Sequence, residues 1–239
     1  MNTWCGFERI DFEFEGHACV LVRPEKELPG RPWVWRTEFF GAFASVDEAM
    51  AGAGYYIAHC SLSNRYGCPS AVEDMEAFRA MMTETHGLSA RPILYGMSRG
   101  GLYAFNYALK YPQHVDKLYL DCPVMDIRSW PGGKGKGVGA PDCWPGCLEC
   151  YGLTEETVQS FRMNPLDRTE ELAATGIPVI VVAGDTDTVV PYDENGWQFV
   201  RRFRKAGGRV VEILKPGCDH HPASLEDPAP VVRFLTDHR

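Results

Sequence analysis

The sequence has no long apolar run and no excess of basic residues. None of its 239 residues belongs to a stretch approaching the about 20 consecutive apolar residues of a membrane-spanning helix. The first residues also lack the basic and apolar segments of a secretory signal. Lys and Arg number 24 against 32 Asp and Glu, a net charge of −8, which argues against nucleic acid or an anionic membrane as a partner. We therefore expect a cytoplasmic protein.

The cysteines do not form a recognisable disulfide or metal framework. Their number is nine, which is odd, and without an export signal we expect reduced thiols. Cys143, Cys147 and Cys150 match the spacing of three thiolates that hold an iron–sulfur cluster in radical enzymes, and zinc would need a fourth ligand. No clear fourth ligand is nearby, so packing thiols are the favoured interpretation. Lys134 and Lys136 lie in a glycine-rich run but lack the Ser or Thr of a phosphate-binding loop.

Short apolar runs alternate with helix-like segments along most of the chain. Residues 10–14 and 18–22 predict a hairpin with a polar outer face. Further strands are predicted at 33–35, 55–58, 92–95, 115–120, 179–182 and 210–214, and helices at 46–53, 71–86, 102–109, 168–174, 193–206 and from about 230. This order predicts an α/β fold: a mostly parallel sheet of about eight strands with helices on both faces and the hairpin at its antiparallel edge.

The alternation is interrupted between residues 122 and 166. The run from Trp130 to Gly137 is too rich in glycine for a regular element, and residues 154–161 are compatible with a helix capped by Thr154. A segment of about 45 residues without strand character inside an α/β pattern is typical of an insertion. We predict one domain over residues 1–239 with a cap or lid insertion at about 122–166.

The strongest local motif is Gly96-Met97-Ser98-Arg99-Gly100. An apolar strand precedes this Gly-x-Ser-x-Gly pattern and a helix-like segment follows it. A strand that enters a helix through so tight a turn needs small flanking residues and leaves the serine hydroxyl at the apex. Ser98 is therefore the candidate nucleophile.

An acid and a base follow in the order that such a serine requires. Asp185 and Asp187 come directly after the strand at 179–182, and His220 and His221 follow the strand at 210–214. Because the carboxyl ends of parallel strands meet at one edge of the sheet, these groups are expected to converge there. A serine hydroxyl is a weak nucleophile until imidazole removes its proton, and a carboxylate fixes the imidazole tautomer.

These motifs resemble the α/β-hydrolase superfamily, and the endings Gly-Asp-x-Asp-x-Val-Val-Pro and His-His-Pro are similar to prolyl-oligopeptidase and dienelactone-hydrolase-type enzymes. The resemblance implies Asp187, three residues after Gly184, as the acid. It implies His220 as the base, with His221 as the alternative because Asp219 replaces a glycine of the pattern. Asp121, at the end of another strand, is an acid position in some relatives.

The oxyanion hole of this superfamily takes two backbone N–H groups. The elbow implies the Arg99 amide, and the second donor is expected from Thr37 or Glu38, where relatives often carry His-Gly. Arg36 and Glu38 would then lie beside the substrate, or would pair with each other at the surface. Trp130 is a candidate for stacking on a sugar ring, although tryptophan before proline is also common in packing.

The resulting functional hypothesis is a serine esterase that needs no metal or cofactor. Its expected substrate is a small molecule with a short acyl ester on a polar group such as a carbohydrate. A peptidase or amidase with the same triad is one alternative, and a ligand-binding protein that retains the fold without catalysis is another.

Overall fold

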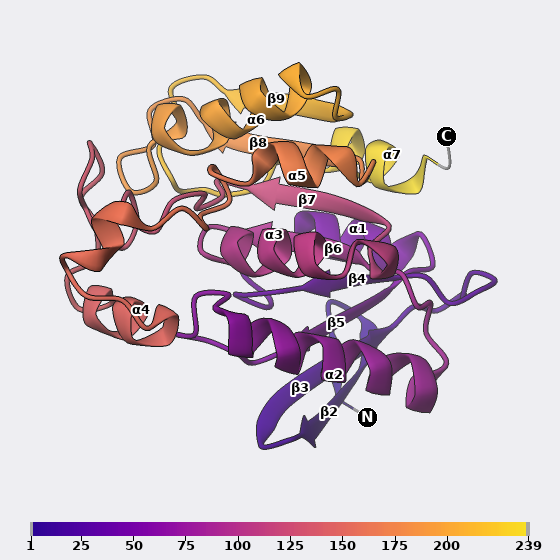
Figure 1. The fold of residues 1–239 in the computed structure, drawn as a ribbon. Coiled ribbons are helices and arrows are strands. Elements are labelled where there is room, and N and C mark those ends of the chain that lie inside the picture. The colour runs from indigo at the N-terminus through magenta and orange to yellow at the C-terminus, as the bar shows by residue number, and fades with distance from the viewer. Residues whose placement is uncertain (1, 238–239) are drawn as a thin grey trace.

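A computed structural model of the protein describes residues 2–237 (Figure 1). The strands within these residues are β1 (Thr3–Trp4), β2 (Phe7–Phe14), β3 (His17–Arg23), β4 (Trp33–Arg36), β5 (Tyr56–Cys60), β6 (Ile93–Met97), β7 (Lys117–Asp121), β8 (Val179–Gly184) and β9 (Val210–Lys215). They form one sheet in the order β1-β2-β3-β5-β4-β6-β7-β8-β9. The strands from β5 through β9 in this order pair in parallel, and the remaining pairs are antiparallel.

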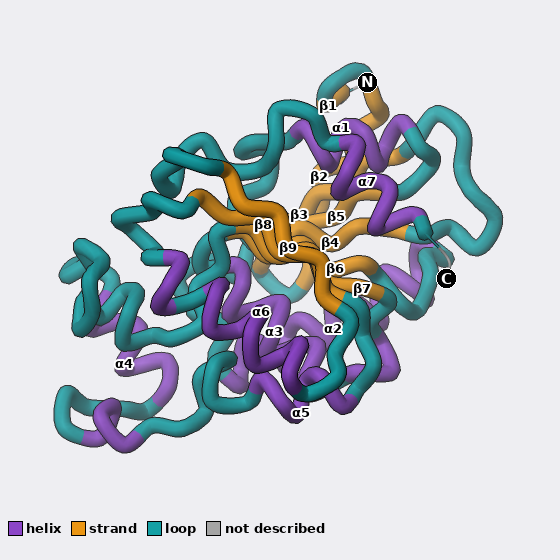
Figure 2. The backbone as a smooth tube through the Cα atoms, turned by 90° about the horizontal axis from the view of Figure 1, so that it is seen from above, coloured by secondary structure: helices purple, strands orange, loops and turns teal. Residues whose placement is uncertain are grey.

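Helices cover both faces of the sheet, as Figure 2 shows from above. The described helices are α1 (Ser45–Gly52), α2 (Pro69–His86), α3 (Gly100–Lys110), α4 (Trp144–Tyr151), α5 (Thr169–Ala174), α6 (Gly196–Lys205) and α7 (Ala229–Thr236). Residues of α2, α3, α5 and α6 share one apolar cluster, and those of α1 and α7 share another. No helix within residues 2–237 combines the length and the apolarity needed to cross a membrane.

Burial along the strands explains why apolar runs in the sequence predicted them. Every residue of β5, β6 and β7 is buried, as expected for parallel strands covered on both faces, whereas the far end of β2 alternates between half-buried and exposed positions. The predicted α/β fold and its antiparallel hairpin are therefore confirmed. The sheet has nine strands in the described residues, one more than expected, because β1 pairs with β2 over only two residues.

Two predicted helices differ from the structure. The helix expected at 193–206 is divided into a 3₁₀ turn at Tyr192–Glu194 and α6, because Asn195 between them has non-helical backbone angles. The helix expected at 154–161 is only a 3₁₀ turn at Thr157–Ser160. Thr154 does cap that turn, since its hydroxyl accepts the amide of Thr157 at 3.2 Å.

The segment between β7 and α5 contains α4, which the sequence pattern did not reveal. In Figure 1 the arrow of β7 points toward the side on which α4 lies. The Tyr151 hydroxyl of α4 donates to the carbonyl of Tyr66 at 2.7 Å, and Cys147 is buried in an apolar cluster with Tyr66. Cys143, Cys147 and Cys150 are free thiols. The cap insertion itself stays a prediction.

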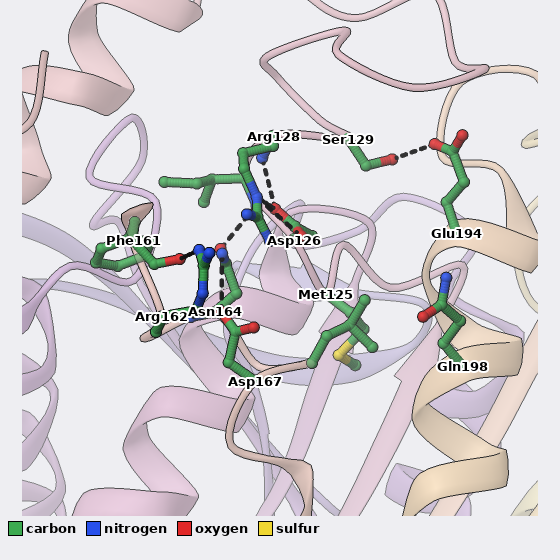
Figure 3. A network of polar contacts seen from close by, with 12 residues as sticks. Met125, Asp126, Arg128, Ser129, Phe161, Arg162, Asn164, Asp167, Glu194 and Gln198 are labelled. Atoms are coloured by element: carbon green, nitrogen blue, oxygen red, sulfur yellow. Dashed lines mark hydrogen bonds and ion pairs between the residues drawn. The ribbon is translucent and has the colours of Figure 1, made fainter. Parts of the chain in front are cut away.

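The glycine-rich run is held against the loop after β8. The Lys136 amide donates to Glu194 Oε1 at 2.5 Å, and the Val138 amide donates to the carbonyl of Thr188 at 3.1 Å. The Ser129 hydroxyl donates to the other Glu194 oxygen at 2.9 Å, as Figure 3 shows. Residues far apart in sequence therefore join the segment after β7 to the loop that carries Asp187.

Candidate active site

Ser98 occupies a strained turn between β6 and α3. Its φ of 52° is in the left-handed region, which side-chain-bearing residues rarely adopt. A Cβ on Gly96 would lie 2.7 Å from the carbonyl oxygen of Gly100, so the turn tolerates no side chain there. The Ser98 amide is fixed by the carbonyl of Asp121 at 2.8 Å. The predicted elbow is thus built as its glycines indicate.

Three sequence-predicted residues form one chain of hydrogen bonds. His220 Nε2 lies 3.0 Å from Ser98 Oγ, and His220 Nδ1 lies 2.7 Å from Asp187 Oδ2. Asp187 follows β8 and His220 follows β9, and both side chains are buried. With the imidazole proton on Nδ1, Nε2 is free to accept the proton of the serine hydroxyl.

The loop backbone orients the Asp187 carboxylate. Its Oδ1 atom accepts the amides of Val189 at 2.9 Å and Val190 at 2.7 Å. These two bonds occupy one oxygen and leave Oδ2 to the imidazole. The turn that follows Asp187 therefore orients its carboxylate so that Oδ2 faces the His220 ring as a hydrogen-bond acceptor.

Two further carboxylates tie the acid loop to the base loop. Asp185 Oδ1 accepts the Gly217 amide at 2.7 Å. Asp219 Oδ1 accepts the amides of Thr188 and His220, each at 2.7 Å. These hydrogen bonds lower the pKa of Asp219 below its usual value. The only sequence signal for Asp219 was its departure from glycine beside the histidine.

The alternative acid and base lie outside this chain of contacts. Asp121 is buried and accepts the hydroxyls of Tyr95 at 3.1 Å and Tyr119 at 2.9 Å. His221 is exposed and stacks on Phe43, with ring centroids 5.2 Å apart. The geometry therefore joins Asp187 and His220, rather than these neighbours, to Ser98.

Thr37 and Glu38, in the loop after β4, were the two predicted sources of the second oxyanion donor, and one of their amides already has a hydrogen-bond partner. The Thr37 amide donates to the carbonyl of Tyr95 at 3.0 Å, so its prediction as an oxyanion donor is wrong. Among residues 2–237 the structure gives the amides of Glu38 and Arg99 no hydrogen-bond partner. The Glu38 nitrogen also lies next to the elbow, 3.7 Å from where a Cβ on Gly100 would be. Glu38 and Arg99 remain the candidate donor pair.

Comparison with known proteins agrees with this architecture. A family model described as the alpha/beta hydrolase fold matches residues 50–137. No curated protein sequence matches the chain. Among solved structures, Porphyromonas gingivalis dipeptidyl peptidase 4 superposes with a TM-score of 0.70 at 16% identity, over 96% of this chain and 35% of that one. The chain has the α/β-hydrolase fold.

Two other solved structures share the α/β-hydrolase fold of this chain. A putative dipeptidyl aminopeptidase IV from Bacteroides ovatus gives a TM-score of 0.68 at 16% identity, covering 96% of this chain and 35% of that one. Pyrococcus horikoshii acylaminoacyl peptidase gives 0.67 at 15% identity, covering 90% of this chain and 38% of that one. The chain spans little more than a third of the length of each of these proteins.

In this α/β-hydrolase fold the side chains of Glu38 and Arg99 form an ion pair. Arg99 Nη2 lies 3.1 Å from Glu38 Oε2, and Arg99 Nη1 donates to Asn64 Oδ1 at 2.8 Å. The guanidinium also lies over the Phe39 ring, 5.0 Å from its centroid. Glu38 is 1% exposed, and burial raises the pKa of its carboxyl although Arg99 opposes the shift.

Arg36 does not face a substrate, contrary to the sequence-based expectation. Its side chain is 0% exposed and pairs with Asp47 at 2.5 Å rather than with the Glu38 carboxylate. Its other nitrogens donate to the carbonyls of Glu38 at 3.1 Å and Ala42 at 2.5 Å. Burial raises the pKa of Asp47 to about 6 against the effect of Arg36. Arg36 thus holds the loop that carries the Glu38 amide.

Trp130 is also mostly covered by protein. It is 9% exposed and packs near Tyr66, with ring centroids 6.3 Å apart. This environment matches the packing interpretation of the tryptophan before Pro131 and leaves little ring surface for a sugar.

Proposed function

We propose that this chain is a serine hydrolase that cleaves a carboxylic ester through an acyl-enzyme on Ser98. The observation that carries the proposal is the continuous contact from Ser98 Oγ through the His220 ring to Asp187, at 3.0 and 2.7 Å. Three side chains from three separate loops meet at the carboxyl edge of one sheet.

Each group has a definite task in the proposed reaction. Ser98 Oγ attacks the ester carbonyl carbon while His220 Nε2 takes the hydroxyl proton, and Asp187 stabilises the imidazolium that forms. The carbonyl oxygen becomes an oxyanion, which the amides of Glu38 and Arg99 bind. His220 then returns the proton to the alcohol as the carbon–oxygen bond breaks. Water repeats the sequence on the acyl-enzyme, releasing the acid and restoring Ser98.

The polar groups beside the elbow support a polar substrate. Arg99 follows the nucleophile directly, and Asn64 holds its guanidinium. Ser63 donates to the Glu38 carboxylate at 3.3 Å. Hydroxyl-rich groups suit such surroundings better than a long alkyl chain, because buried polar groups are costly to leave unpaired. We therefore propose a short acyl ester on a polar compound such as an acylated sugar.

A peptidase or amidase is equally supported. The three solved structures compared above carry peptidase names, and the same triad cleaves esters and amides by one mechanism. A ligand-binding protein without catalysis is the alternative from another class, and the aligned triad argues against it.

Covalent labelling separates an enzyme from a binding protein. A fluorophosphonate probe should label the wild type on Ser98 and leave Ser98→Ala unlabelled, whereas equal labelling of both would overturn the proposal. Acetylated sugars, short p-nitrophenyl esters and peptide amides then separate the esterase from the peptidase. Hydrolysis of amides without esters would assign the peptidase reading instead.

A further inference from the structure

Cys122 lies against the triad but has no task in the proposed reaction. It follows β7 directly, and its Sγ atom, a carboxylate oxygen of Asp187 and a ring nitrogen of His220 all lie within 4.8 Å of one another. All three residues are buried. Sulfur, imidazole nitrogen and carboxylate oxygen are the ligand types that bind Zn²⁺ in proteins.

We propose that Cys122, Asp187 and His220 form a zinc-binding site whose occupation switches off Ser98. Zinc bonds of about 2.0–2.3 Å in tetrahedral geometry require ligand atoms roughly 3.3–3.8 Å apart. The three candidate ligand atoms lie within 4.8 Å of one another, and His220 Nδ1 is 2.7 Å from Asp187 Oδ2, so binding requires the sulfur to move inward and the imidazole and the carboxylate to move apart, with water as the fourth ligand. The zinc site itself is inferred from these three residues alone. The loss of activity on zinc binding also rests on the proposed function.

The charges of the three ligands balance that of zinc. One thiolate and one carboxylate neutralise the ion, and imidazole is a neutral ligand. The Cys122 thiol gives up its proton when it binds zinc. Zinc replaces that proton, and one proton per ion is released to solvent.

The position of the ligands explains why binding would stop the reaction. His220 Nδ1 is the ring nitrogen that faces Asp187, at 2.7 Å, and zinc takes the place of its proton. The neutral ring then carries its proton on Nε2, the atom 3.0 Å from Ser98 Oγ. A protonated Nε2 cannot accept the serine proton. The ion therefore locks the imidazole in the tautomer that is useless as a base.

Binding is tested without any substrate. Zinc is titrated into the Ser98→Ala variant in competition with a chromophoric chelator, and one ion per chain is expected. Cys122→Ser in the same background should weaken binding by at least the roughly 10–100-fold that loss of an outer-shell partner costs. Cys218→Ser, which removes a half-buried thiol of the neighbouring base loop, should leave the affinity unchanged.

Cobalt(II) reports a metal–sulfur bond by its absorption spectrum. This measurement therefore stays informative even if Cys122→Ser fails to fold. With cobalt bound, a sulfur-to-metal charge-transfer band should appear in Ser98→Ala and in Cys218→Ser. Absence of zinc binding, absence of this band, or equal zinc affinity in Cys122→Ser would overturn the proposal.

Inhibition is then measured in each active variant against the same variant without zinc. Wild type and Cys218→Ser should lose activity at the concentration that fills the site, and Cys122→Ser should need at least about tenfold more zinc. If the chain hydrolyses nothing, the serine-hydrolase proposal fails while the zinc titration still decides the metal site. Full activity with zinc bound would overturn the switch.

Discussion

Glu38 and Arg99 are ion-paired through their side chains at 3.1 Å, and within residues 2–237 neither of their backbone amides has a hydrogen-bond partner. One residue comes from the loop after β4 and the other from the start of α3. We infer that this ion pair sets the spacing of the two amides, the proposed oxyanion donors, which come from distant segments of the chain. Asn64 fixes the arginine from its other side.

Loss of this pair should lower turnover more than substrate binding. Glu38→Gln keeps the backbone amide but removes the charge that holds Arg99. We expect kcat to fall roughly tenfold, less than the roughly 10²–10³-fold cost of deleting a donor, with KM little changed. Steady-state kinetics on the best ester measures this. Asp11→Asn, which breaks an exposed ion pair with Arg9, is the matched control. An unchanged kcat in Glu38→Gln would contradict the positioning role.

The two adjacent histidines should behave very differently. His220→Ala removes the proposed base and should reduce kcat by at least about 10⁴-fold, as in other triads. His221→Ala removes an exposed ring that stacks on Phe43 and meets the His220 ring edge-on, with centroids 4.9 Å apart, and we expect a far smaller loss of kcat than in His220→Ala. Single-turnover kinetics with an activated ester compares the two. A larger loss in His221→Ala would reverse the assignment.

The sequence predicted most of the sheet and the three side chains that the structure brings into contact at Ser98, because their signals are local. Strands buried on both faces read as apolar runs, and Ser98 lies in a turn that only glycines allow. The surroundings of the triad depend on contacts between segments distant in sequence. Arg36 pairs with Asp47 inside the fold, and Arg99 pairs with Glu38. No rule on residue spacing in the sequence indicates either of these ion pairs. A charged side chain next to a motif therefore says little about whether it faces substrate.

The buried pair of Arg36 and Asp47 should matter for stability. Both side chains are at most 1% exposed, so Arg36→Met leaves an uncompensated carboxylate in the interior. We expect a loss of about 3–5 kcal/mol in the free energy of unfolding, measured by urea denaturation. Glu27→Gln, at an exposed carboxylate that pairs with Arg23 and Arg31, should cost much less. Equal effects of the two variants would show that the buried pair contributes nothing special.

Asp219 should make the stability depend on acidity. Its pKa is lower in the folded protein than the ordinary value of about 3.9. Its carboxylate therefore stabilises the fold above that value, and the contribution is lost as the pH falls through the lowered pKa. Asp219→Asn should be less stable than wild type near neutral pH, with a difference that shrinks in acid. Urea denaturation across this range measures the difference, and a gap that stays constant with pH would contradict the expectation.

The left-handed backbone at Ser98 carries a consequence for evolving this protein. A non-glycine residue at φ 52° costs of the order of 1–3 kcal/mol, and glycine adopts the same angle without steric penalty. Ser98→Gly should therefore raise the thermal midpoint while removing the proposed nucleophile. A library sorted only for heat resistance would enrich that variant and discard catalysis. Directed evolution of this scaffold therefore has to select for turnover and heat resistance in the same round.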